Sequence, residues 1–353
     1  MNHILFVDGF NERYAPAYPL REFSTPTGSA PAITWAVNTS NGALTDFCIR
    51  LNNTAPGVYW RLPVSSTYTD TPLIGLAYKI QAHREGLIVA FGRDGQPQLE
   101  LWSTSTGKLE VRRGEHRIAR SLLGMTPNTW HYLEFGALLH PTKGSLFVFI
   151  DNMAAIVEYD WPTQGASGAG ANHYGLGVGA FTSWVDDLYM ASAPERLGKA
   201  VITTRPASDW VSPTYPAHEW TPSYPASTGA GYGTAGLLVP GEGRWFYTGR
   251  TDAELWALPA AARLLAPEGD VAAVQLNTIA SRASDDTAPH RLQTGIRIGG
   301  QAASAVYDVA RMVNTSDRNW TRYSSILPQN PITALPWTRA DVSNIEMGLK
   351  AVR

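Results

Sequence analysis

The sequence predicts an all-β protein of two antiparallel β-sandwich domains with a short C-terminal helix. Short runs rich in β-branched and aromatic residues recur along the 353 residues, separated by Gly, Pro, Asn and Asp. No long segment repeats apolar residues at helical spacing. Only 16% of the residues are charged, while 32 Gly, 24 Pro, 12 Trp and 15 Tyr are present, which indicates a loop-rich β protein with neutral contact surfaces. The length favours two domains.

The first predicted domain spans residues 1–195 and is framed by an opening run, Ile4–Phe10, and a closing run, Phe181–Tyr189. We expect these runs to be the first and last strands and to pair with each other. Residues 163–180 are rich in Gly, Ala and Ser, and they are expected to form a surface loop. Further strands are predicted at Gly57–Leu62, Ile74–Ile80, Gly86–Phe91 and Trp130–Phe135.

Two β-hairpins are predicted inside this domain. The first joins Leu99–Ser103 to Lys108–Arg112, and its alternation of apolar and polar residues gives it one solvent-facing side. The second joins Leu146–Ile150 to Ala155–Tyr159 around a turn, and its first arm is apolar enough to be buried on both faces.

Four motifs carry a resemblance to a known fold family. They are Val7–Phe10, Thr129–Glu134, Phe149–Asn152 and Trp184–Tyr189, in this order. Together they resemble the laminin-G-like, concanavalin-A-like jelly rolls found in bacteriophage virion proteins. The resemblance implies two stacked antiparallel sheets and a surface that faces a glycan or a protein partner.

The second predicted domain spans residues 196–353 and contains a segment, 205–236, in which prolines alternate with aromatic residues. Proline excludes regular helix there, so the aromatic side chains pack on their own domain or contact another subunit. The candidates for such an assembly interface are Trp210, Tyr215, Trp220 and Tyr224. Strands of a second sandwich are predicted at Lys199–Thr204, Trp245–Tyr247, Val271–Asn277, Leu292–Ile298 and Tyr307–Val313.

The predicted helix spans about residues 338–349. Thr338 is its expected N-cap, with Asp341 three residues later, and Val342, Ile345 and Leu349 share one face. The tract from Pro331 to Lys350 is similar to the tail of structural proteins of tailed phages.

Catalytic motifs are incomplete or absent. Concanavalin-like glucanases carry an E-x-D-x-x-E spacing, but here Glu158 and Asp160 are followed by Thr163 in place of the third acid. Adjacent Asp186 and Asp187 would point to opposite faces of a strand, and a Ca²⁺ ligand role for one of them is a minor alternative. No His pair, nucleophile elbow or phosphate-binding loop occurs, so no catalytic residue, metal or cofactor is predicted.

Non-catalytic sugar binding would need exposed aromatic rings. The candidates are Tyr59, Tyr68, Trp102 and Tyr174. Packing within the sheet is the favoured alternative for Trp102, which lies inside a strand, whereas Tyr68 and Tyr174 are expected in loops.

These features predict a non-enzymatic structural protein of a tailed-phage virion, sited in the tail, baseplate or fibre region, with host surface glycan and other virion proteins as partners. The alternatives are a capsid decoration or neck protein and, third, a glycan-processing enzyme. The resemblance favours a homo-oligomer, with a trimer as the commonest case.

Other partners are excluded by composition. The net charge is −2 and no Lys/Arg run is longer than Arg112–Arg113, which argues against nucleic acid as a partner.

No apolar stretch approaches a membrane span and no secretory signal opens the chain, so we expect synthesis in the host bacterial cytoplasm before assembly into the virion. The single cysteine, Cys48, excludes an intrachain disulfide and is expected to be a small buried side chain.

Overall fold

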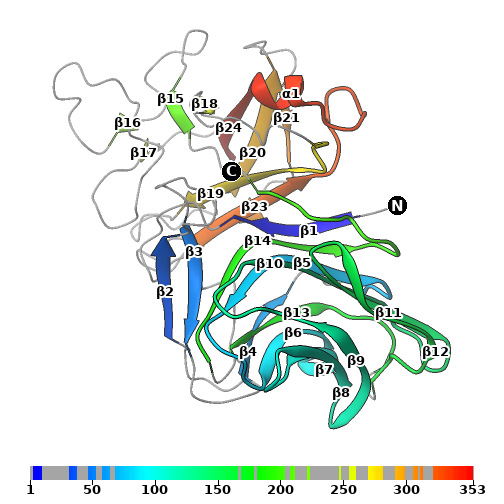
Figure 1. Ribbon diagram of the computed structural model, residues 1–353. Coiled ribbons are helices and arrows are strands. Elements are labelled where there is room, and N and C mark those ends of the chain that lie inside the picture. The colour runs from blue at the N-terminus through cyan, green and yellow to red at the C-terminus, as the bar shows by residue number, and fades with distance from the viewer. Residues whose placement is uncertain are drawn as a thin grey trace. The chain divides into compact units, whose positions relative to one another are not determined.

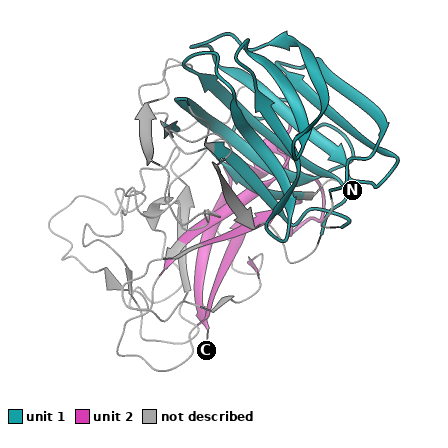
Figure 2. Cartoon of the chain, turned by 90° about the horizontal axis from the view of Figure 1, so that it is seen from below, with its two compact units in different colours: residues 1–11, 20–202 teal, residues 12–19, 203–353 magenta. Residues whose placement is uncertain are grey.

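The computed structural model describes residues 3–9, 32–37, 47–52, 58–63, 68–165, 168–178, 181–202, 207–210, 221–222, 246–247, 254–259, 269–280, 291–298, 305–308, 311–312 and 321–352. Two compact units divide the chain: residues 1–11 with 20–202, and residues 12–19 with 203–353 (Figure 2). Most described residues lie in strands, all described strand pairs are antiparallel, and the described residues contain one short helix. The predicted all-β class is therefore confirmed.

The described residues of the first unit form two antiparallel sheets that lie one above the other in Figure 1. The eight-stranded sheet has the order β12 (Met153–Trp161), β11 (Gly144–Ile150), β10 (His131–Leu138), β5 (Pro72–Ile80), β14 (Ser183–Ser192), β3 (Phe47–Asn52) and β2 (Ala32–Val37), with β1 (His3–Asp8) also paired to β14. The six-stranded sheet has the order β4 (Val58–Pro63), β13 (His173–Val178), β6 (Gly86–Arg93), β7 (Gln96–Ser103), β8 (Lys108–Arg113) and β9 (His116–Gly124).

The predicted pairings of this unit are found in the structure. The opening and closing strands pair, with Asp8 opposite Leu188. The hairpins β7–β8 and β11–β12 form as expected. In β11, however, buried residues alternate with half-buried ones, so this arm is not fully buried on both faces.

The core of the first unit lies between the two sheets, where alternate residues of each strand meet. Phe91 of β6 stacks on Phe135 of β10 with ring centroids 4.6 Å apart, and Tyr174 of β13 meets Phe91 edge-on at 5.5 Å. Cys48 of β3 is 1% exposed, and burial raises the pKa of its thiol to about 12. The cysteine is thus a buried small side chain, as predicted.

The opposite side of the eight-stranded sheet is covered in part by the segment 193–202. Its anchor is the buried carboxylate of Glu134, which accepts hydrogen bonds from Tyr189 Oη at 2.8 Å, Arg196 Nε at 2.9 Å and the Gly198 amide at 2.8 Å. The Arg196 guanidinium also lies 3.7 Å from the ring centroid of Phe149. The strand predicted at Lys199–Thr204 does not form over its described part, because residues 199–202 follow this anchored path instead.

The described residues of the second unit form a six-stranded antiparallel sheet and two strand pairs. The sheet has the order β15 (Ala207–Trp210), β18 (Glu254–Pro259), β24 (Ile345–Val352), β20 (Arg291–Ile298) and β21 (Val306–Tyr307), with β22 (Arg311–Met312) also on β20. The strand pairs are β16 (Thr221–Pro222) with β17 (Phe246–Tyr247), and β19 (Val274–Ala280) with β23 (Thr321–Leu327). Of the strand predicted at Tyr307–Val313, the described residues place Tyr307 in β21 and Arg311–Met312 in β22.

A small core joins β19 and β23 to the sheet of this unit. Leu276 of β19 packs with Ile296 of β20, Ile345 of β24 and the buried ring of Trp337. Behind them the buried guanidinium of Arg297 donates from Nε to Glu346 at 2.6 Å.

The predicted C-terminal helix is wrong in length. Helix α1 spans only Arg339–Ser343, although the expected capping box of Thr338 and Asp341 is present. The chain then enters β24, where Leu349 lies opposite both Leu255 and Thr294. Pairing on two sides satisfies the backbone groups of this strand, and that outweighs the helical spacing of its apolar residues.

Candidate functional site

Tyr174 does not lie at a surface. It belongs to β13, inside the stretch predicted as a loop, and its side chain is 1% exposed with Oη donating to the Ala191 carbonyl at 2.5 Å. Burial raises the pKa of this phenol. A ring packed in the core cannot stack on a sugar, so Tyr174 is removed from the candidates.

The glycines that suggested a loop here belong to a central strand. A Cβ on Gly177 would lie 2.1 Å from the Leu87 carbonyl oxygen of β6, so only glycine allows the two strands to approach.

Several candidates lie partly or wholly outside the described residues. Tyr59 is in β4, opposite Gly177, and Trp210 is in β15, but nothing beyond the backbone of either is described. Tyr215, Trp220 and Tyr224 lie outside the described residues altogether. The proposed assembly interface therefore stays a prediction.

Tyr68 is exposed, as expected, at 47%. Its Oη donates to both carboxylate oxygens of Asp94, at 3.0 and 3.2 Å, and the Arg93 guanidinium lies 4.1 Å from its ring centroid. Asn172 also donates to Asp94, and these bonds, that of Tyr68 first, lower the pKa of the Asp94 carboxyl. The groups around Tyr68 are thus largely engaged with one another.

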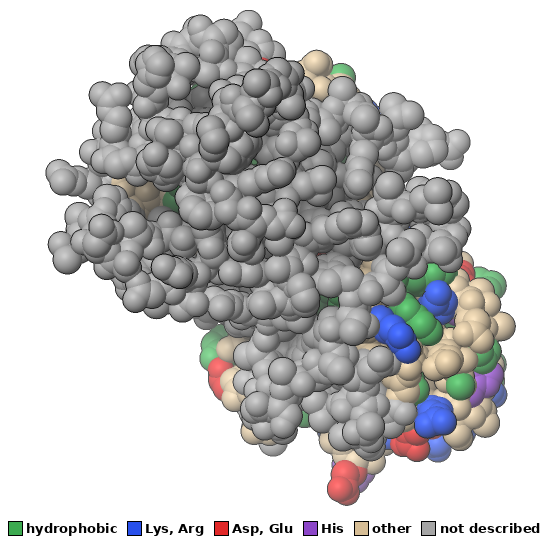
Figure 3. Space-filling view, turned by 90° about the vertical axis from the view of Figure 1, so that its left-hand side faces the viewer, with side chains coloured by type: hydrophobic (Ala, Val, Ile, Leu, Met, Phe, Trp, Pro, Cys, Tyr) green, Lys and Arg blue, Asp and Glu red, His purple; other side chains and the backbone are tan. Residues whose placement is uncertain are grey.

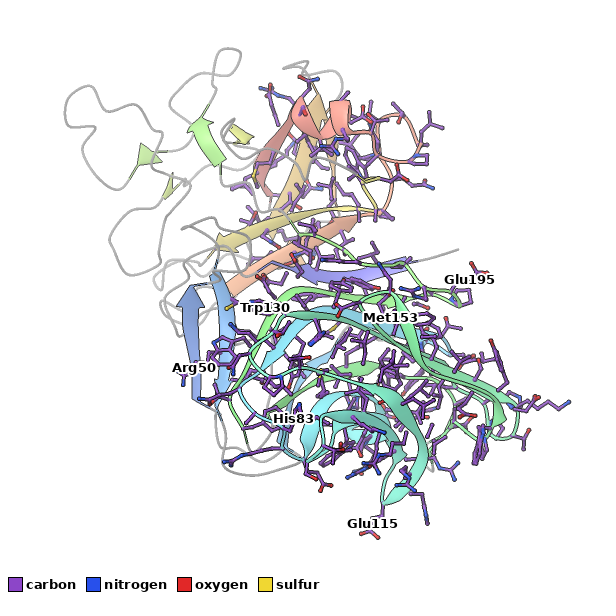
Figure 4. The ribbon with its side chains drawn as sticks, in the orientation of Figure 1. Arg50, His83, Glu115, Trp130, Met153 and Glu195 are labelled. Atoms are coloured by element: carbon purple, nitrogen blue, oxygen red, sulfur yellow. The ribbon has the colours of Figure 1, made fainter. Side chains whose placement is uncertain are left out.

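A second aromatic cluster lies on the eight-stranded sheet. Lys79 Nζ lies 5.0 Å from the ring centroid of Trp130 and 4.6 Å from that of Trp184, and the Arg50 guanidinium lies 5.8 Å from Trp184. Arg50 and Trp130 lie on the same side of the unit in Figure 4. On the side seen in Figure 3, basic side chains are likewise interspersed with hydrophobic ones. Cations already contact both indoles of this cluster.

Trp102 lies on the outer face of the six-stranded sheet, the face turned away from the core. Leu101 and Val111 point into the core, so the alternate residues of β7 and β8 point outward. Strand pairing arranges the outward side chains in two rows. The first row is Leu87, Trp102, Glu110 and Arg120, and the second is Ala90, Glu100, Arg112 and Arg117.

We call six of these side chains, Glu100, Trp102, Glu110, Arg112, Arg117 and Arg120, the arginine–glutamate grid. They come from three neighbouring strands, β7, β8 and β9, and Figure 4 shows Glu115 at the tip of the β8–β9 hairpin. Trp102 packs on buried Leu87 and Ala90. The Arg112 guanidinium lies 4.6 Å from its ring centroid, so the indole acts as a support for this arginine.

Arg112 is fixed by two carboxylates as well. Its Nη2 donates to Glu110 Oε2 at 2.7 Å, and its Nη1 lies 2.9 Å from Glu85 Oε1. Burial alone would lower the pKa of Arg112, but these carboxylates raise it. The guanidinium is therefore held charged and in one orientation.

The two glutamates of the grid differ in protonation behaviour. Burial raises the pKa of the Glu100 carboxyl, against the opposing effects of the Trp102 Nε1 hydrogen bond at 3.3 Å and the nearby Arg112 charge. Burial also acts on Glu110, but the hydrogen bond from Arg112 and the charges of Arg112, Arg120 and Arg117 lower its pKa. Glu110 is thus the stable anion at the centre of the grid.

Of the six grid residues, only Trp102 is predicted as a site residue from the sequence. The signal was present, because the predicted hairpin of β7 and β8 already had one polar face that carries Glu100, Glu110 and Arg112. What the pattern could not supply was the register that places these residues beside Trp102, or the contribution of β9.

The incomplete acid motif is not completed by the fold. Asp160 is exposed with φ 56°, and Thr163 is 0% exposed, with Oγ1 donating to the Leu138 carbonyl at 2.6 Å. Thr163 is therefore a structural residue at the position where the motif needs an acid. Within the described stretches, no three His, Cys, Asp or Glu side chains are grouped so as to hold a metal ion. No helix in the described part of the chain is long and apolar enough to cross a membrane.

Comparisons with known proteins find similarity in solved structures only. Neither a family model nor a curated protein matches the chain. A sialidase has 9% identity and a TM-score of 0.40, and the match covers 54% of this chain and 19% of the sialidase. A carbohydrate-binding module from Bacillus subtilis has 12% identity and a TM-score of 0.31, over 48% of this chain and 96% of the module. A Bacillus subtilis protein of unknown function with a galectin-like fold has 12% identity and a TM-score of 0.32, over 54% of this chain and 100% of that one.

Proposed function

We propose that the first unit of this protein binds glycans, without cleaving them, through the arginine–glutamate grid. The supporting observation is that Arg112 is held in one orientation on this face, beside Arg117 and Arg120, whose side chains are largely exposed. Sugar hydroxyls accept hydrogen bonds, so a guanidinium that is held in one orientation and keeps N–H groups in reserve suits them as a donor. Arg112 is such a donor, because Glu110 and Glu85 orient its guanidinium without using all five N–H groups, and Trp102 supports it.

The arrangement supports binding rather than hydrolysis. Glycoside hydrolysis needs two carboxyls, one protonated and one available to attack or to activate water. Glu100, with its raised pKa, suits the first role. Both oxygens of Glu110 are already engaged, however, Oε2 by Arg112 and Oε1 by Arg117 and Arg120. The second role is therefore blocked in this geometry.

The test is glycan binding by the full chain and its variants, first on a glycan array and then by isothermal titration against the best ligand. Arg112→Lys keeps the charge but loses the two-pronged donor geometry, and we expect affinity to fall about 10- to 100-fold. Trp102→Ala should act in the same direction, because it removes the support of Arg112.

The matched control is Trp161→Ala, which removes another tryptophan, 42% exposed, on β12 of the other sheet. It should leave affinity unchanged. Equal binding by all variants would contradict the proposed site. Glycan cleavage that is lost in Glu100→Gln would replace the binding proposal with an enzymatic one.

We also propose that the protein is part of a phage virion, and this rests on the sequence resemblance alone. In that setting the grid would contact host surface glycan from the tail, baseplate or fibre region, and multiple copies would strengthen weak contacts. Immunogold labelling of particles with an antibody to the first unit tests it. Gold at the tail is the expected result, gold over the head or neck would favour a decoration or joining role, and unlabelled particles would contradict the virion setting.

A further inference from the structure

The arginine–glutamate grid has more guanidiniums than carboxylates that pair with them at short distance. Three guanidiniums converge on the single carboxylate of Glu110, while Glu85 contacts only Arg112 among the described ion pairs. Arg112 takes the short contact, at 2.7 Å. Arg117 Nη1 and Arg120 Nε both reach the other oxygen, Oε1, at 3.5 Å. These two arginines therefore share one distant acceptor.

Arg117 and Arg120 also keep most of their hydrogen-bonding capacity. Their side chains are 58% and 41% exposed. Each guanidinium has five N–H donors in a planar fork. Beyond Glu110, the described contacts add only a hydrogen bond from Arg120 Nη2 to Thr106 Oγ1 at 3.3 Å. Several donors of both arginines are thus available to a ligand.

An irregularity in β9 places these two arginines on one face. Residues three apart on a regular strand point to opposite sides of a sheet. In β9 the register shifts, so that Arg117 lies opposite Arg112 but Ala119 lies opposite Val111, which leaves Ile118 as an extra residue. Bulges of this kind redirect side chains. Here the bulge brings both guanidiniums to the same oxygen of Glu110.

From this arrangement we infer that the ligand is an acidic glycan, and that Arg117 and Arg120 bind its carboxylate while Arg112, oriented by Glu110 and Glu85, donates to a neighbouring hydroxyl. A carboxylate between two guanidiniums accepts charge-assisted hydrogen bonds from both, and it supplies the negative charge that this part of the grid lacks. The inference rests on the proposed function, because it names the substrate class of the same face.

The test compares each acidic polysaccharide with its own neutral form, in which the carboxyl groups are reduced. The full chain is titrated with polygalacturonate, alginate, hyaluronan and polysialic acid, and with the carboxyl-reduced, neutral form of each. At least one acidic polymer should bind tenfold or more tightly than its neutral form. The double variant Arg117→Gln/Arg120→Gln should lose this preference and retain the weaker binding of the neutral form.

The control double variant, Lys143→Gln/Lys199→Gln, removes the same charge from two exposed positions outside the grid. It should keep the preference for the acidic form. Circular dichroism of each variant confirms that the sheets are intact. Single-stranded DNA serves as an unrelated polyanion and should bind at least tenfold more weakly than the acidic polysaccharide.

The outcomes separate the two claims. Equal binding of acidic and neutral polymers, lowered by Arg112→Lys, would overturn the acidic-glycan inference and leave the proposed function intact. Binding of none of the polysaccharides, together with an empty glycan array, would contradict the proposed function itself. Equal binding of DNA, or the same loss in the lysine control, would show unspecific attraction of polyanions and would also overturn the inference.

Discussion

Replacing Phe91 with alanine should lower the free energy of unfolding of the first unit by about 3–5 kcal/mol. The ring is 0% exposed and lies between the two sheets, stacked on Phe135 and in edge contact with Tyr174. Its removal loses the transfer free energy of the ring and leaves a cavity that β-strands fixed by their partners cannot close. Denaturant unfolding of the full chain, followed by near-ultraviolet circular dichroism, measures the change.

The control for this prediction is Tyr159→Ala. Tyr159 is an aromatic residue of similar size on β12, but it is 71% exposed. A surface substitution away from caps and turns changes stability by about 0.5 kcal/mol or less. Equal losses in the two variants would show that the stacked ring does not contribute as the packing indicates.

Replacing Glu134 with alanine should also destabilise the first unit, by about 3–5 kcal/mol, because it leaves buried groups without their partner. Glu134 is 1% exposed and accepts from Tyr189, Arg196 and the Gly198 amide. Its loss leaves the Tyr189 hydroxyl and the Gly198 amide without their hydrogen-bond acceptor. It also releases the segment 193–202 from the sheet. Besides the unfolding midpoint, hydrogen exchange should rise selectively in residues 193–202.

Two further variants separate the charge from the hydrogen bonds at this position. Glu134→Gln keeps an acceptor and should cost less than the alanine variant. Arg196→Ala should cost more than Glu134→Gln, because it leaves the buried carboxylate with two neutral donors and no compensating charge. Exchange that stays unchanged in 193–202 after Glu134→Ala would contradict the anchoring role.

The sequence predicted the pairings of the first unit because its signals there are local or repetitive. The β7–β8 hairpin has an alternating pattern, and the β1–β14 pair joins two apolar runs that each contain a Val-Asp step. By contrast, glycine favours loops in general, so Gly175 and Gly177 hid the central strand that carries Tyr174. The reason for glycine there is a close strand contact, which depends on tertiary packing.

The predicted C-terminal helix is longer than the observed one for a related reason. The spacing of Val342, Ile345 and Leu349 fits one long helix as well as it fits a short helix followed by a strand. Which of the two forms depends on pairing with β18 and β20, which are distant in the sequence. The candidate site had the same limit. Trp102 was identified as an aromatic residue, but its role as the support of Arg112 depends on the register between β7 and β8.

The buried thiol of Cys48 gives this protein a native reporter of its own unfolding. Alkylating reagents react with the thiolate, and a thiol with a pKa of about 12 and 1% exposure supplies almost none at neutral pH. Cys48 lies in β3, which pairs with β2 on one side and β14 on the other. The labelling rate therefore measures how often this part of the sheet opens, with no engineered probe, and folded copies cannot be joined by a disulfide while the sheet is closed.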